Sequence, residues 1–324
     1  MKPLFLLLVS LPAMAAIEGT VVNKTTGKPQ SGVQVTLTRL TDKGMQPAAS
    51  GSTDAQGRFR LDADAASAHL IQARYQNVSY SAQLQPNQPR IEIAVYDALP
   101  KVSAAEVTQH MILVETDGQE LVVNETLIYN NDSQTTWYAP KGTARFYIPA
   151  AAGENRMARA IAPGGLPVDR PLLATGERQV FTIDFPVKPG ETRFDLSYKL
   201  PASAGATLGG RVLHEGTPAR LVVPQGIQVE GQGLEPAGNE PSTGAAIFTI
   251  KDRNYSIKVS GAGQLKRMEA TERSEEDGPR IQVMQPPGYE RSWKFFLALA
   301  ILSLALAFAA HYSRGAGQEG SARR

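Results

Sequence analysis

The sequence predicts an all-β fold, with two or three β-sandwich domains in tandem and one C-terminal transmembrane helix. Much of the chain consists of short runs in which apolar and polar residues alternate, separated by Gly, Pro, Asn and Asp, as is typical of strands and turns. No helical periodicity interrupts this spacing over residues 17–97. A single apolar stretch near the C-terminus has about the length that a membrane span requires.

Composition excludes several classes of function. The 324 residues include 33 Lys and Arg against 31 Asp and Glu, a net charge of +2, so the chain has no basic field for collecting phosphates and nucleic acid is not expected as a partner. There are no cysteines, which excludes disulfides, thiolate metal sites and thiol nucleophiles. The length suffices for hydrophobic cores without disulfides.

Residues 1–16 predict a secretory signal peptide. One positive residue, Lys2, precedes a short apolar run, which ends in the small-residue pattern Ala13-Met14-Ala15-Ala16. Cleavage is expected after Ala15 or Ala16. An uncleaved membrane anchor needs about 17–25 apolar residues, and this run is shorter.

Residues 17–99 predict a first β-sandwich. Val33, Val35 and Leu37 alternate with polar residues, as do Phe59 and Leu61, so these five side chains are expected to face one core. The segment 54–57, Asp-Ala-Gln-Gly, predicts a turn in which the acid bonds backbone amides and the glycine takes a positive φ.

Four motifs follow one another in this first segment: Gly19-x-Val21, Gly27-x-Pro29, Gly32-Val33-x-Val35-x-Leu37 and Thr53-Asp54-x-x-Gly57-x-Phe59-x-Leu61. In this order they resemble the carboxypeptidase regulatory-like domain, a transthyretin-like sandwich with a carbohydrate-binding-like fold, over residues 17–97. The resemblance implies an accessory module of exported proteins, with carbohydrate as one class of ligand. Tyr75 and Tyr80 are candidates for stacking on a sugar, against a structural role as the alternative.

Residues 103–200 predict a second sandwich. Two strand-like runs flank Asp117-Gly118, a hairpin signal. Residues 206–263 form a third β block, which is either a separate small domain or a continuation of the second sandwich.

The remaining segments predict attachment to a membrane. Residues 264–292 are polar and Pro-rich and form the expected stalk. Residues 293–312 are the expected transmembrane helix, because their apolar core spans about 24 Å and Trp and Tyr flank it. Residues 313–324 form the expected cytoplasmic tail, with three arginines and one acid. A cleaved signal then places the body in the periplasm or outside the cell, on a single-pass protein of the bacterial inner membrane.

The search for catalytic chemistry yields no candidate site. The four histidines, at positions 69, 110, 214 and 311, are not spaced as metal ligands, and the pair His214-Glu215 is most simply a chance neighbour pair. Asp62 and Asp64 lack the surroundings of a calcium loop. No nucleophile elbow or phosphate loop occurs. We therefore predict no catalytic, cofactor-binding or metal-binding residue, and no cofactor.

These observations predict a non-enzymatic, membrane-anchored envelope protein whose β-sandwich modules bind a protein partner or a glycan. The main alternative is an accessory subunit of a membrane complex, in which the single helix packs on other helices. A hydrolase on a β scaffold remains the third reading, because sequence does not reveal whether two carboxylates converge.

Overall fold

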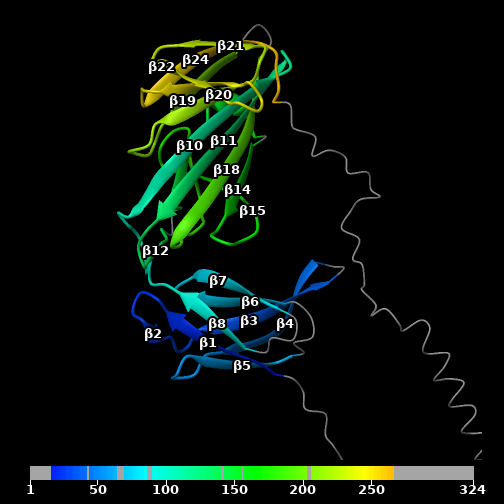
Figure 1. Cartoon of the computed structure of the whole chain (residues 1–324), viewed down its shortest axis with the longest axis vertical. Helices are drawn as coiled ribbons and strands as arrows, with labels where there is room; N and C mark the ends of the chain where they lie inside the picture. The colour runs from blue at the N-terminus through cyan, green and yellow to red at the C-terminus, as the bar shows by residue number, and fades with distance from the viewer. Residues whose placement is uncertain are drawn as a thin grey trace, which may run out of the picture. The chain divides into compact units, whose positions relative to one another are not determined.

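A computed structural model describes residues 16–41, 44–63, 69–85, 90–139, 142–154, 156–202 and 206–265, which form two β-sandwiches (Figure 1). The expected signal peptide up to residue 15, the stalk beyond residue 265, the transmembrane helix and the tail lie outside these ranges. Within them, no helix has the length and apolar character needed to cross a membrane.

The first sandwich consists of two four-stranded sheets. In one sheet β1 pairs antiparallel with β2 and β5 and parallel with β8, and the other sheet has the order β4-β3-β6-β7. The strands are β1 (Ala16–Asn23), β2 (Lys28–Pro29), β3 (Gln34–Thr41), β4 (Gly44–Ser52), β5 (Arg58–Asp62), β6 (His69–Tyr75), β7 (Val78–Leu84) and β8 (Arg90–Val95).

The predicted core of this sandwich is confirmed. Side chains from both sheets form one apolar cluster, and the five side chains that alternation assigns to it are no more than 5% exposed: Val33, Val35, Leu37, Phe59 and Leu61. The predicted turn is also present. Asp54 Oδ1 accepts hydrogen bonds from the backbone amides of Gln56 and Arg58, at 2.9 and 2.8 Å, and Gly57 has a φ of 71°.

The second sandwich is built on an eight-stranded sheet with the order β15-β14-β18-β11-β10-β20-β23-β22. The three-stranded sheets β13-β17-β16 and β19-β24-β21 share one apolar cluster with it. Its earlier elements are β10 (Ala105–Thr116), β11 (Glu120–Asn131), β13 (Ala144–Tyr147), the 3-10 turn η1 (Ala150–Ala152), β14 (Arg156–Ile161), β15 (Val168–Arg170), β16 (Leu172–Ala174), β17 (Val180–Ile183) and β18 (Gly190–Pro201).

The third β block and the second sandwich have strands in the same sheet. β20 pairs parallel with β10 and antiparallel with β23, so strands from residues 206–263 extend the sheet begun by residues 105–201. The later strands are β19 (Ala206–Arg211), β20 (Ala219–Val223), β21 (Ile227–Gly231), β22 (Leu234–Asn239), β23 (Ala246–Ile250) and β24 (Asn254–Gly261).

The chain between the sandwiches is also paired. The short strand β9 (Ala98–Leu99) runs parallel to β12 (Thr136–Trp137). The Tyr80 hydroxyl of β7 accepts a hydrogen bond from the Thr136 hydroxyl at 2.8 Å, since its own proton goes to the Tyr96 carbonyl. The predicted hairpin at Asp117-Gly118 is present, since β10 and β11 pair antiparallel on either side of it.

Candidate functional site

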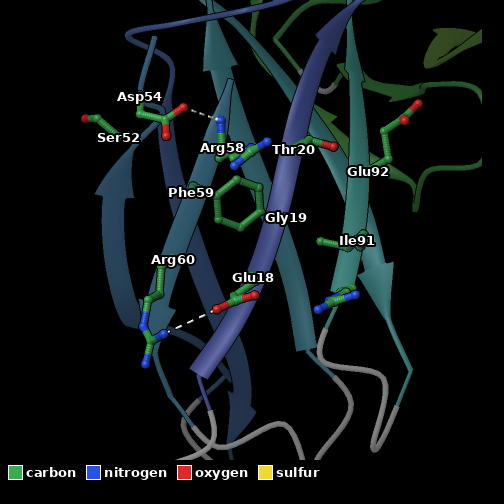
Figure 2. A pocket seen from close by; sticks show the side chains of 11 residues that line it. Glu18, Gly19, Thr20, Ser52, Asp54, Arg58, Phe59, Arg60, Ile91 and Glu92 are labelled. Atoms are coloured by element: carbon green, nitrogen blue, oxygen red, sulfur yellow. Dashed lines mark hydrogen bonds and ion pairs between the residues drawn. The ribbon is translucent and has the colours of Figure 1, made fainter. Parts of the chain in front are cut away.

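A shallow groove of about 840 Å³ lies on the first sandwich. It lies across β5, β1 and β8, with residues 52 and 54 at its margin (Figure 2). Since neighbouring strands bring residues of equal register side by side, side chains far apart in the sequence form rows across this face.

Two rows of outward side chains line the groove. In the first row Glu18 of β1 pairs in register with Arg60 of β5 and with Arg90 of β8, which places an acid between two bases. Figure 2 shows the ion pair between Arg60 and Glu18, in which Nη1 lies 3.2 Å from Oε1. In the second row Thr20 lies between Arg58 and Glu92. The groove therefore presents both signs of charge at fixed spacing.

Gly19 lies between the two rows. Because it has no side chain, the Phe59 ring and the Ile91 carbonyl can lie close to it. A Cβ at this position would lie 2.4 Å from Phe59 Cζ and 2.5 Å from the carbonyl oxygen of Ile91. The Phe59 ring takes this space and is only 5% exposed (Figure 2). The ring is therefore part of the core and offers no free aromatic face to a ligand in the groove.

The motifs, the two four-stranded sheets and the groove all lie in one segment of the chain. Residues 16–95 match the family model of the carboxypeptidase regulatory-like domain. The match covers the first quarter of the 324 residues, so it identifies this domain and does not extend to the second sandwich. The regulatory-like domain is thus the recognised β-sandwich module of the chain, and the predicted resemblance is confirmed.

Other comparisons add little. No curated protein matches the chain. Among solved structures, two crystal structures of a point mutant of an M1 zinc metallopeptidase from Deinococcus radiodurans, one bound to a Tyr-Ser-Ala substrate, match at 14% identity with TM-scores of 0.25 and 0.26. Each alignment covers 48% of this chain and 42% of the metallopeptidase chain, so the match spans less than half of that enzyme. At these scores the likeness supports no conclusion about fold or function.

The two tyrosines considered as sugar platforms in the regulatory-like domain have structural partners. Tyr80 is 3% exposed, and its hydroxyl bonds to the carbonyl of Tyr96 at 2.9 Å. Burial raises its pKa to about 12. The Tyr75 hydroxyl donates to Asp97 Oδ1 at 2.9 Å and accepts from Asn23. Tyr80 therefore has the structural role that was the alternative to sugar stacking, because β7 turns it into the core.

A second polar group lies inside the second sandwich. β10 carries a bulge between Val107 and Gln109, where its register with β11 shifts by one residue. The extra residue changes the phase of the strand, so Val107 and His110 both point inward although three positions separate them. His110 is consequently 3% exposed.

Glu125 reaches the same interior from β11. It occupies an inward position between Val123 and Leu127 and is 8% exposed. Its Oε1 lies 2.9 Å from His110 Nε2, and His110 Nδ1 lies 2.9 Å from Nε2 of His214, which precedes β20. Three residues that are up to 104 positions apart thus form one hydrogen-bonded chain.

Two tyrosines lie near this chain of polar groups, Tyr198 in the core and Tyr255 partly buried. Burial raises the pKa of Tyr198 and of Tyr255 well above the ordinary value, and the charge of Glu125 adds to the effect. Both phenols therefore stay neutral at physiological pH. Burial and the charge of His110 lower the pKa of His214.

Sequence reasoning missed this cluster and treated His214-Glu215 as a chance pair. One signal was present: Glu125 interrupts the otherwise apolar inward series of residues 121, 123, 127 and 129. A charged residue at such a position needs a buried partner. The bulge that turns His110 toward it has no comparable mark in the sequence.

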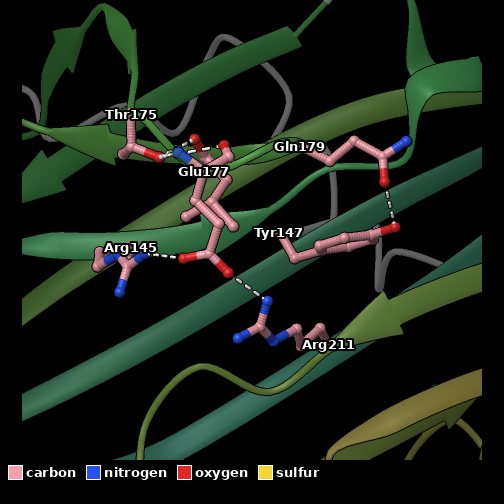
Figure 3. A network of polar contacts seen from close by, with 7 residues as sticks. Arg145, Tyr147, Thr175, Glu177, Gln179 and Arg211 are labelled. Atoms are coloured by element: carbon pink, nitrogen blue, oxygen red, sulfur yellow. Dashed lines mark hydrogen bonds and ion pairs between the residues drawn. The ribbon is translucent and has the colours of Figure 1, made fainter.

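A further polar network joins the two smaller sheets of the second sandwich (Figure 3). Glu177, in the turn before β17, bonds Arg145 of β13 at 2.5 Å and also bonds Arg211 of β19. These two arginines lower the pKa of its carboxyl group. All three side chains are about 40% exposed, so the network fixes the position of the turn more than it adds stability. Among the described residues, no group of three or more His, Asp or Glu side chains is placed to hold a metal ion.

Proposed function

We propose that this chain is a non-enzymatic protein of the bacterial cell envelope, anchored in the cytoplasmic membrane by residues 293–312, and that its regulatory-like domain binds a protein partner outside the cytoplasm. The observation that carries the proposal is the groove across β5, β1 and β8 with its two rows of charged residues. Fixed charges of both signs suit a partner with the complementary pattern, because complementarity selects partners and speeds association.

The chemistry of the groove favours a protein partner over a glycan. Sugar sites usually offer an aromatic face, and the aromatic residue in this groove, Phe59, is buried under Gly19. Rows of arginines and carboxylates can instead pair with the side chains and backbone of a polypeptide. These arginines and glutamates lie at paired positions on neighbouring strands, which fixes the spacing of their charges. A partner must therefore match this spacing.

The polar cluster of the second sandwich supports a non-enzymatic role. Both ring nitrogens of His110 are engaged, one by Glu125 and one by His214. These two interactions assign His110 a structural role, as the partner of a buried carboxylate. Turnover of peptide or ester substrates that is lost in His110→Ala would contradict this part of the proposal.

The test is co-purification from the native membrane in mild detergent, with charge-reversal variants. Arg90→Glu places two acids side by side in the first row, and we expect the partner to be lost. Arg39→Glu, on the exposed side of β3 in the other sheet, is the matched control and should retain it. A partner that remains bound to Arg90→Glu would overturn the assignment of the groove.

The same experiment tests the alternative of an accessory subunit. A partner that survives Arg90→Glu but is lost when the chain is truncated after Gly288 would bind through the apolar segment. A truncated form that still sediments with membranes would show that another part of the chain provides the anchor. Retention on cell-wall polymer without a protein partner would favour the glycan reading.

A further inference from the structure

The loop between β19 and β20, residues 212–218, contacts the first half of β10. At its start the Val212 amide donates to the carbonyl of Arg253 at 2.8 Å. Near its end the Thr217 hydroxyl donates to the carbonyl of Val107 at 2.7 Å. Between them, the ring of His214 faces His110 with 2.9 Å between Nε2 and Nδ1. The loop is therefore held to β10 by one hydroxyl and one imidazole.

The contact between the two imidazoles depends on their protons. Two facing ring nitrogens form a hydrogen bond only when one carries a proton and the other does not. If either histidine is neutral, its tautomer can supply the missing acceptor or donor. If both histidines are protonated, two N–H groups meet head to head and two positive charges lie side by side. The hydrogen bond between the two rings therefore persists when one of the histidines is positively charged, and it is lost when both are.

Each imidazole has a further partner besides the other ring. Glu125 Oε1 lies 2.9 Å from His110 Nε2 inside the core, so both ring nitrogens of His110 are hydrogen-bonded. The backbone carbonyl of Glu215 lies 3.3 Å from His214 Nδ1 and can accept a hydrogen bond from it.

Two other charged groups act on His214 besides His110. Arg253 opposes a positive charge on His214, and Glu125 favours one from farther away. The carboxylate of Glu215 is engaged by Arg253 at 3.0 Å and is exposed, so water screens it. The charge that meets His214 directly is that of His110.

We propose that residues 212–218 form an acid-released latch, in which protonation of His214 at its contact with His110 detaches the loop from β10. Two residues of this loop, Thr217 and Pro218, form part of the lining of a hollow of about 250 Å³, together with Met111, Val222 and Ile247. Release of the loop would remove this part of the lining and widen the hollow at low pH.

The direction of the pH dependence follows from linkage. Because the pKa of His214 is lowered in the closed state, the released loop binds this proton more readily than the closed loop. The closed state is at full stability above the ordinary histidine pKa of about 6.5 and loses stability as the pH falls through the lowered pKa. One proton changes the opening equilibrium by at most about tenfold per pH unit.

Hydrogen exchange on the full-length protein in mild detergent tests the latch. Labelling times at pH 7.5 and pH 5.0 are scaled to the intrinsic exchange rate at each pH. We expect the scaled uptake of peptides covering residues 212–218 to rise at pH 5.0, while peptides of β11 stay protected. Equal uptake in the loop at both pH values, or a loss of protection throughout β11 and β18, would overturn a local latch.

Three variants assign the effect to His214. His214→Gln keeps a hydrogen-bonding side chain that does not titrate, and the loop should lose its pH dependence. His69→Gln, on β6 of the regulatory-like domain, removes a histidine elsewhere and should leave the dependence intact. Thr217→Val removes the other tether, so uptake should rise by the same factor at both pH values. Retention of the wild-type pH dependence in His214→Gln contradicts the proposal.

Discussion

The two sandwiches bury their inward positions in different ways. In the regulatory-like domain the strand β5 turns only apolar side chains inward, and the buried Asn23 lies at a turn, where it bonds Gln30, Asp97 and the backbone amide of Thr25. In the second sandwich β10 and β11 bury His110 and Glu125. The stability of an apolar core depends on side-chain volume and little on pH, whereas the stability of a core with titratable groups depends on both. The comparison predicts different sensitivities for neighbouring parts of one chain.

The largest effect is expected at the apolar core of the regulatory-like domain. Phe59→Ala removes a ring packed against Gly19 and should lower the free energy of unfolding by about 3–5 kcal/mol. Denaturant unfolding of the full chain, followed at pH 7.5 and pH 5.5, should show the same loss at both pH values. Met45→Ala, at a position 49% exposed, is the control and should change little. If the loss of unfolding free energy in Phe59→Ala differs between the two pH values, the two cores do not differ in pH sensitivity as proposed.

The second sandwich should respond to loss of a charge with no change of shape. Glu125→Gln keeps an oxygen that can accept from His110 but removes the compensating carboxylate, at a cost of roughly 1.5–3 kcal/mol at neutral pH. Glu106→Gln, exposed on β10, serves as the matched control with an expected cost close to zero. Equal unfolding midpoints for the two variants would show that the buried pair contributes nothing.

Two glycine substitutions in the regulatory-like domain should have smaller effects on stability, and comparing them separates backbone strain from steric crowding. Gly57→Ala and Gly27→Ala both place a side chain at positive φ, 71° and 69°, at about 1–2 kcal/mol each. At Gly57 the new Cβ would also lie 2.8 Å from the carbonyl oxygen of Val21, whereas nothing lies within 4 Å at Gly27. Thermal melting should therefore rank Gly57→Ala below Gly27→Ala. The reverse order would contradict the geometry of this turn.

The smallest effect concerns Lys188, which connects the two regions by donating to the carbonyl of Ser79 at 2.6 Å. Burial lowers its pKa to about 8. The unfolded chain therefore holds this proton between about pH 8 and pH 10.5, so Lys188 makes the protein more stable as the pH rises through that window. The melting temperature of Lys188→Met relative to wild type should fall between pH 7.5 and pH 10.

Lys199 provides the opposite case as a control. Its ion pair with Glu120 raises its pKa, so its contribution is present below the ordinary lysine value and is lost as the pH rises through the raised value. Lys199→Met should not show the fall expected for Lys188→Met below pH 10. Parallel melting curves for the two variants would mean that Lys188 is not desolvated.

The sequence by itself determined the strands and the apolar core of the regulatory-like domain. Val33, Val35, Leu37, Phe59 and Leu61 are buried as alternation predicted, because a strand with period two can bury only one face. The turn at Asp54 to Gly57 and the hairpin at Asp117-Gly118 were likewise predictable, since both depend on residues close in the chain. The membrane anchor stays a prediction.

The tertiary structure decided which distant residues meet. The parallel pairing of β10 with β20 brings residues 206–263 into the sheet of the second sandwich, and no local pattern specifies that pairing. The bulge at residue 108 turns His110 inward, and a loop 104 positions later brings His214 to it. Alternation predicts a face only while the register is unbroken, and a bulge shifts it by one residue. The contacts of Glu125, His110 and His214 therefore depend on long-range packing, which local sequence does not encode.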